Sequence, residues 1–124
     1  MDDRAKIGKK GEDEACLYLL RNGHSIVERN WRGGHCEIDI ISADALGLHF
    51  VEVKSRTAPV MAEPELNVNP TKQKRLVRAA LRYLHSKGSR FADAEVYFDI
   101  IAIVFDHNNT QINYYPQAFI PIYD

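Results

Sequence analysis

Asp39, Glu52 and Lys54 are the residues of this chain whose types and spacing could carry out chemistry. Each lies in an apolar run typical of a strand, where a charged side chain is costly to bury unless it is paired or binds a metal. Side chains alternate between faces along a strand, so Glu52 shares a face with Lys54, as Glu37 does with Asp39. If the two runs form a hairpin through residues 42–47, Asp39 and Glu52 lie close together with Lys54 beside them. The pattern predicts a divalent-metal site with a lysine attached.

The elements that position these residues alternate between helical and strand-like periodicity. The order predicted is helix, three-stranded meander, helix, strand, strand, which is an α/β fold with a mixed sheet flanked by helices. The first expected helix is 7–22, with an apolar stripe of Ala15, Cys16, Leu19 and Leu20. The second is capped by Asn69, starts at Pro70 and ends near Lys87-Gly88. The expected strands are 25–32, 35–42, 48–56, 95–105 and 111–115. Gly33-Gly34 is expected to form the first turn, and residues 57–69, with two prolines, an exposed loop.

The length of 124 residues suits one domain spanning residues 1–124. No apolar run approaches the roughly 18 to 20 residues of a membrane span, and the first residues do not resemble a signal peptide. We therefore expect a cytoplasmic protein with no membrane partner. A net charge of -1 argues against indiscriminate binding of polyanions.

The two cysteines, Cys16 and Cys36, lie inside a predicted helix and strand and suit a reducing compartment better than a disulfide framework. Neither is expected to be a ligand. A zinc site recruiting His35 and Cys36 is not expected, because the chain has no C-x-x-C pair.

Basic residues are concentrated in the second predicted helix. Between Thr71 and Phe91 there are seven Lys and Arg residues and no acidic one. Lys74, Arg78 and Arg82 recur at i, i+4 and i+8, which could follow the phosphates of a nucleic acid. A charged outer face is also the ordinary property of an amphipathic helix, so the sequence leaves both interpretations open.

Five short motifs occur in order along nearly the whole chain. They are Gly8-x-x-Gly11-Glu12-x-x-Ala15, Arg29-Asn30-Trp31-Arg32, Glu37-Ile38-Asp39-Ile40-Ile41, Phe50-Val51-Glu52-Val53-Lys54-x-Arg56 and Lys72-Gln73. A lone Asp and Glu-x-Lys pattern arises by chance, but five ordered blocks are specific. On these residues the chain is identified as a member of the bacterial YraN family. Its element order is similar to the catalytic core of the PD-(D/E)xK nuclease superfamily.

This resemblance implies a restriction-endonuclease-like core similar to archaeal Holliday junction resolvases. It implies a metal-dependent endonuclease that hydrolyses nucleic acid, with DNA as the expected partner and branched DNA as one candidate substrate. Asp39, Glu52 and the carbonyl of Val53 would hold Mg²⁺ or Mn²⁺, and Lys54 would orient the attacking water. Glu12 would hold a second ion or a metal-bound water. The residues expected to contact nucleic acid are Lys72, Gln73, Lys74, Arg75, Arg78 and Arg82.

Other interpretations stay open for several of these residues. Lys54 could form a structural ion pair with the carboxylates, and Glu12 could simply favour the first turn of its helix. Glu37 could support the site or pair with Arg56 or Arg32. Trp31 could stack on an unpaired base, although core packing is the commoner role of tryptophan.

Two departures from the family pattern concern the loops and not the ligands. Cys36 stands where a glycine is usual, and Met61-Ala62 replaces Phe-Gly.

Two rival functions are also compatible with the sequence. The chain could be a non-catalytic nucleic-acid-binding module of a repair or recombination assembly, or a structural adaptor. Paired incisions by an active enzyme would need a homodimer.

Overall fold

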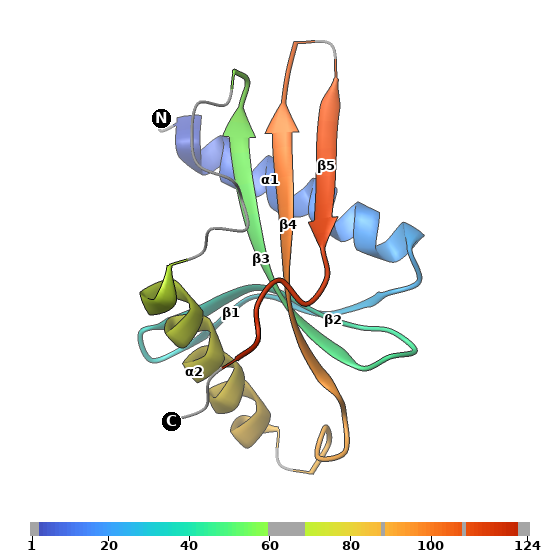
Figure 1. Cartoon of the computed structure of the whole chain (residues 1–124), viewed down its shortest axis with the longest axis vertical. Helices are drawn as coiled ribbons and strands as arrows, with labels where there is room; N and C mark the ends of the chain where they lie inside the picture. Colours follow the sequence, from blue (N-terminus) through green and yellow to red (C-terminus); the bar gives the residue numbers. More distant parts are fainter. Residues whose placement is uncertain (1–2, 60–68, 88, 108, 122–124) are drawn as a thin grey trace.

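The protein forms one five-stranded mixed sheet with a helix on each face (Figure 1). The computed structural model describes residues 3–59, 69–87, 89–107 and 109–121. In chain order the elements are α1 (Asp3–Arg21), β1 (Ser25–Gly33), β2 (Cys36–Ala43), β3 (Leu48–Thr57), α2 (Pro70–Ser86), β4 (Val96–Phe105) and β5 (Thr110–Tyr115). The strands lie in the sheet in the same order as in the chain. The predicted element order and the α/β class are confirmed.

One strand pair gives the sheet its mixed character. β3 and β4 are parallel over their whole length, while the other neighbouring pairs are antiparallel. A parallel pair needs a long crossover connection, and α2 lies within it. α2 packs mainly over β2 and β1, whereas α1 packs mainly over β3, and both β3 and β4 are rich in buried apolar residues.

The helices cover opposite faces of the sheet and produce two apolar clusters. On one face α2 buries Leu76, Val77, Ala80 and Tyr83 against Phe50 and Phe98. On the other face α1 buries Ala15, Cys16 and Leu19 against Val51, Ile101 and Ile103. In β3, the neighbouring residues Phe50 and Val51 point to opposite clusters, as the period of a strand requires. Both cysteines are free thiols.

The limits of the helices differ in detail from the prediction. α1 begins at Asp3 and not at the predicted residue 7. The predicted start was too late because the first turn of the helix is polar and carries no apolar periodicity. Leu20 is 53% exposed, since only the neighbouring Leu19 faces the sheet. α2 begins as predicted: the side chain of Asn69 accepts a hydrogen bond from the Lys72 N–H at 2.9 Å, and Pro70 occupies the first turn.

The first hairpin turn is displaced by one residue from its predicted place. Gly33 still belongs to β1, and the turn is formed by Gly34, whose φ of 62° favours glycine, and His35. Most of the predicted 57–69 loop, with the Met61-Ala62 departure, lies outside the described residues.

Candidate functional site

Asp39 lies where β2 and β3 separate. The two strands pair from Ala43↔Leu48 to Ile40↔Val51, and there their pairing ends. Beyond that point β3 continues beside β4, while β2 continues beside β1. The Asp39 carboxylate enters this fork, where its Oδ2 accepts a hydrogen bond from the Val53 N–H at 2.8 Å. The Asp39 side chain thus accepts the Val53 N–H, which a backbone carbonyl of the neighbouring strand would accept in a continuous sheet.

The backbone around Asp39 is irregular. Ile38 packs in the cluster under α2, whereas Ile40 packs in the cluster under α1, although residues two apart in a regular strand share a face. In the neighbouring β1, Asn30 has a φ of 51°, and the β1–β2 register shifts between Ile26 and Glu28. Irregularities of this kind redirect side chains and are common beside functional sites. Here they coincide with a carboxylate accessible from both faces of the sheet.

The electrostatic environment of Asp39 is unfavourable for a carboxylate. Burial raises its pKa to about 7; the Val53 N–H opposes this shift, while the negative charges of Glu12, Glu52 and Glu37 reinforce it. Like charges gathered around a buried carboxylate favour its neutral form. A bound cation would reverse that balance, so this donor set of carboxylate oxygens fits a hard divalent metal ion.

A cleft of about 500 Å³ reaches Asp39 from the α1 side. Glu12, Val53, Ser55 and Arg56 are among the residues that line it. Glu12 is brought here by a close helix-to-strand contact: Gly11 is buried, and a Cβ on it would lie 2.8 Å from the Ser55 Cβ. Only glycine allows this approach. Glu12 is also 3.9 Å from the guanidinium of Arg29, which forms a shorter ion pair of 2.8 Å with Asp13.

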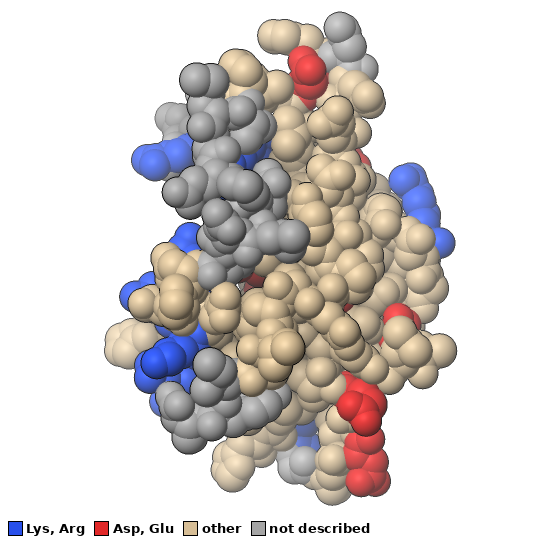
Figure 2. Space-filling model, viewed as in Figure 1, with Lys and Arg blue, Asp and Glu red and all other residues tan. Residues whose placement is uncertain are grey.

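A second cleft, of about 670 Å³, reaches Asp39 from the α2 side. Its floor carries the acidic residues Glu37, Asp39 and Glu52, and its wall is formed by basic residues of α2. These basic residues are Lys72, Arg75 and Arg78. Figure 2 shows Lys and Arg side chains gathered over α2. A polyanion could therefore lie along α2 while an ion held by the carboxylates faces it.

The structure brings some of the predicted site residues together and leaves others apart. Glu12, Asp39, Glu52 and Val53 converge at the fork. Lys54 follows Glu52 on β3 and is half-buried, but among the described residues it does not line either cleft. Gln73 and Lys74 on α2 do not line either cleft.

Three of the six residues predicted to contact nucleic acid line the α2-side cleft, and the row predicted from the i, i+4, i+8 spacing shares only Arg78 with them. The expected row was Lys74, Arg78 and Arg82, whereas the row that lines the cleft is Lys72, Arg75 and Arg78. Arg82 instead donates to the carbonyl oxygen of Gly33 at 3.0 Å. The apolar contacts of α2 set its rotation on the sheet, and that rotation turns Lys74 away from the cleft.

Trp31 and Glu37 occupy supporting positions. Trp31 packs edge-on against Tyr83, with ring centroids 5.4 Å apart, so it belongs to the core as the commoner role predicts. The carboxylate of Glu37 lies 3.9 Å from Arg32, and both side chains are largely exposed.

Sequence reasoning missed a buried polar network that joins His24, Asp44, His49 and Asp99. His49 lies between two carboxylates, with Nδ1 2.6 Å from Asp99 and Nε2 2.8 Å from Asp44. Burial lowers the pKa of His49, but the hydrogen bonds to Asp99 and Asp44 outweigh it, and the net pKa is raised. Burial and the neighbouring His49 lower the pKa of His24. The one signal available was Asp99, a lone acid within the apolar run of β4.

The site and its scaffold together define an α/β protein with a carboxylate cluster at a fork in a mixed sheet. The family model of the uncharacterised protein family UPF0102 matches residues 11–103. A UPF0102 protein of Bacteroides thetaiotaomicron is 40% identical over 121 residues, covering 98% of each chain. Others are 42% identical in Geobacter metallireducens, over 91% of each chain, and 40% identical in Thermodesulfovibrio yellowstonii, over 94% of this chain and 97% of the relative.

The chain therefore belongs to the UPF0102 family, and the predicted YraN family membership is confirmed. Within the described residues, no helix is long and apolar enough to span a membrane.

Proposed function

We propose that this protein is an endonuclease of the restriction-endonuclease-like PD-(D/E)xK class, which hydrolyses phosphodiester bonds in nucleic acid with Mg²⁺ or Mn²⁺. The observation that carries the proposal is the position of Asp39. Its carboxylate lies in the fork between β2 and β3, with three further carboxylates near enough to raise its pKa. A chain gains nothing in stability from this crowding, and charges retained at such a cost are typical of functional sites.

The residues at the fork fit the proposed ion. Asp39 and Glu52 are its carboxylate ligands, and the carbonyl of Val53 is a third, because the N–H and C=O of one strand residue point to the same edge and the N–H already faces Asp39. Glu12 approaches from α1 and holds a second ion or a coordinated water. Once bound, the ion supplies a Lewis acid for the phosphate and lowers the pKa of a water.

The remaining groups of the chain bind and orient the substrate. The Val53 N–H fixes the Asp39 carboxylate, which keeps one ligand rigid before the substrate arrives. Lys54 lies two residues after Glu52 on β3 and lines neither cleft; the role assigned to it rests on the Glu-x-Lys motif and is to orient the attacking water or to neutralise charge that develops on the phosphate. Lys72, Arg75 and Arg78 hold the backbone of the nucleic acid along the cleft.

A cleavage assay tests this proposal. The purified chain is incubated with single-stranded, duplex, flapped and four-way DNA, and with RNA, in Mg²⁺, Mn²⁺ or EDTA. Cleavage is expected in Mg²⁺ or Mn²⁺ and not in EDTA. The Asp39→Ala variant, prepared in parallel, reports any contaminating nuclease. Binding of these substrates without cleavage would instead support the non-catalytic binding module, for which the basic wall of the cleft is the specific observation.

The basic wall of the α2-side cleft makes a prediction for binding. Arg75→Ala and Arg78→Ala are each expected to lower the slope of log affinity against log salt on duplex DNA by about 0.9, because each removes one phosphate contact. Fluorescence anisotropy titrations at several salt concentrations measure this slope. Lys74→Ala is the matched control, since it removes the same charge from the same helix on the side away from the cleft. Equal effects of Lys74→Ala and Arg78→Ala would show that the wall does not direct binding.

A further inference from the structure

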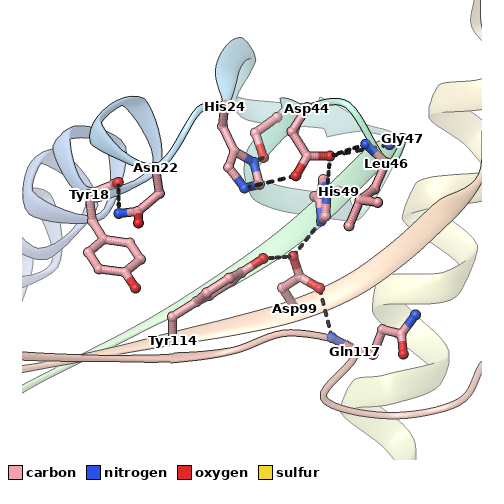
Figure 3. A network of polar contacts seen from close by, with 11 residues as sticks. Tyr18, Asn22, His24, Asp44, Leu46, Gly47, His49, Asp99, Tyr114 and Gln117 are labelled. Atoms are coloured by element: carbon pink, nitrogen blue, oxygen red, sulfur yellow. Dashed lines mark hydrogen bonds and ion pairs between the residues drawn. The ribbon is translucent and has the colours of Figure 1, made fainter.

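The network missed by sequence reasoning lies around the turn that follows β2, whereas Asp39 lies in the middle of that strand. His24 follows α1, Asp44 follows β2 in the turn to β3, and His49 is the second residue of β3 (Figure 3). The three side chains converge although they come from three separate segments. One ligand atom from each lies within 4.8 Å of the others.

Both imidazole rings are turned so that Nε2 faces Asp44. The Nδ1 of His24 is 3.0 Å from the Ser42 hydroxyl, and the Nδ1 of His49 is 2.6 Å from Asp99 Oδ2. The Nε2 of His24 is 3.4 Å from Asp44 Oδ2, and that of His49 is 2.8 Å from Asp44 Oδ1. Histidines that bind metals have this arrangement, in which a hydroxyl or carboxylate holds one ring nitrogen and leaves the other for the ion.

The supporting residues are themselves held in place. Asp44 Oδ1 accepts hydrogen bonds from the N–H groups of Leu46 and Gly47, at 3.0 and 3.2 Å. Asp99 is fully buried and accepts hydrogen bonds from the Tyr114 hydroxyl at 2.6 Å and the Gln117 N–H at 2.9 Å (Figure 3). The carboxylates therefore keep their positions whether or not an ion is bound.

We propose that His24, Asp44 and His49 form a binding site for a transition-metal ion of the Zn²⁺ class. Ligands at about 2.0 to 2.1 Å from a tetrahedral ion are separated from each other by roughly 3.4 Å. The Nε2 of His24 and Oδ2 of Asp44 already have this separation, whereas the Nε2 of His49 lies 2.8 Å from the other oxygen of Asp44, Oδ1. One ligand atom from each residue lies within 4.8 Å of the others, so the ligands close on a single ion by shifts of up to about 1.4 Å. Two imidazoles and one carboxylate favour Zn²⁺ over the hard ions proposed for Asp39.

The surroundings provide the fourth position. A cleft of about 460 Å³ is lined by the three ligands and by Tyr97, Tyr114 and Gln117, and it admits water and the ion. His24 and His49 are otherwise buried, at 7% and 3% exposure. The ion ties the end of α1 to the β2–β3 turn, so its role is structural and independent of the cleavage proposed above.

The alternative is a network satisfied without metal. A doubly protonated His49 donates from Nδ1 to Asp99 and from Nε2 to Asp44, so both of its ring nitrogens have a hydrogen-bond partner without a metal ion. Zn²⁺ binding requires the ion to replace the proton on Nε2. The experiment must therefore distinguish a metal site from an ion pair.

The test uses the full chain carrying Asp39→Asn, so that the first site cannot account for the result. After treatment with EDTA and dialysis, Zn²⁺ is titrated by calorimetry, and Co²⁺ is added as a probe whose visible absorption reports tetrahedral coordination. One equivalent of Zn²⁺ is expected to bind and to raise the melting temperature. Loss of a residue that only hydrogen-bonds to a metal ligand weakens metal binding roughly 10- to 100-fold. Asp44→Asn and His24→Gln each alter a ligand itself and should therefore weaken Zn²⁺ binding by more than this.

Two further variants make the outcome decisive. Ser42→Ala keeps all three ligands and is expected to weaken Zn²⁺ binding about 10-fold, which gives a readout even if the ligand variants do not fold. His107→Gln removes an exposed histidine outside the network and should leave the titration unchanged. No stoichiometric binding, or equal binding by the Asp39→Asn chain with and without Ser42→Ala, would overturn the metal site and leave an ion pair centred on His49.

Discussion

Asp39→Asn is expected to raise the free energy of unfolding of the metal-free protein by roughly 2 to 4 kcal/mol at pH 8. The folded-state pKa of Asp39 is about 7, against an ordinary value of 3.8. Between these values the folded chain binds more protons at this site than the unfolded chain, so stability falls as pH rises from about 4 to 7. About three pKa units correspond to at most about 4 kcal/mol, and partial exposure to solvent lowers that figure. Asparagine carries no charge and keeps an oxygen to accept the Val53 N–H.

Urea unfolding in EDTA at several pH values measures this effect. The wild-type stability should decline between pH 4 and pH 7 by more than that of the variant. The exposed Asp93→Asn serves as the control, because it removes the same charge and should change stability by less than about 0.5 kcal/mol. Mg²⁺ or Mn²⁺ should raise the melting temperature of the wild type and not that of Asp39→Asn. A large loss of stability in Asp39→Asn, with no metal effect on the wild type, would identify the cluster as a structural ion pair.

Metal-dependent cleavage is expected to fall by at least about 100-fold in each of Asp39→Asn, Glu52→Gln and Lys54→Ala. The first two remove a ligand charge, and the third removes the cation that orients water or neutralises the phosphate. Glu12→Gln should have a smaller effect, because Glu12 reaches the fork only from α1 and holds a second ion or a water. Initial rates on the best substrate of the panel provide the measurement.

The hierarchy of these effects separates the assigned roles. Glu95→Gln is the matched control, since this exposed carboxylate lies outside both clefts and should leave the rate unchanged. Full activity in any one of the three main variants would remove that residue from the catalytic set. A loss in Glu12→Gln as large as that in Asp39→Asn would place Glu12 among the primary ligands.

Local patterns in the sequence determined the elements and part of the site. Alternation of apolar residues predicted β2 and β3, and the short turn between them predicted that Asp39 lies near Glu52. The cap at Asn69 located the start of α2 for the same reason, because capping depends on neighbours in the chain. These features need no knowledge of distant segments.

Other features of the site depend on packing between distant segments. The fork beyond Ile40 and Val51 forms because β2 follows β1 while β3 follows β4, and no local period encodes that divergence. The raised pKa of Asp39 requires burial and charges from α1, β2 and β3 together. Likewise, the contacts of α2 with the sheet decided that Arg75, and not Lys74, faces the cleft.

The histidine and aspartate network shows the same limit most clearly. Sequence patterns placed Asp44 in a turn and gave no role to His24 or His49, because each residue taken alone has an ordinary local environment. Only the folded sheet brings the end of α1, the β2–β3 turn and β4 within hydrogen-bonding distance. Local periodicity fixes which face of an element is apolar, whereas burial, charge coupling and ligand geometry arise from contacts between residues far apart in the chain.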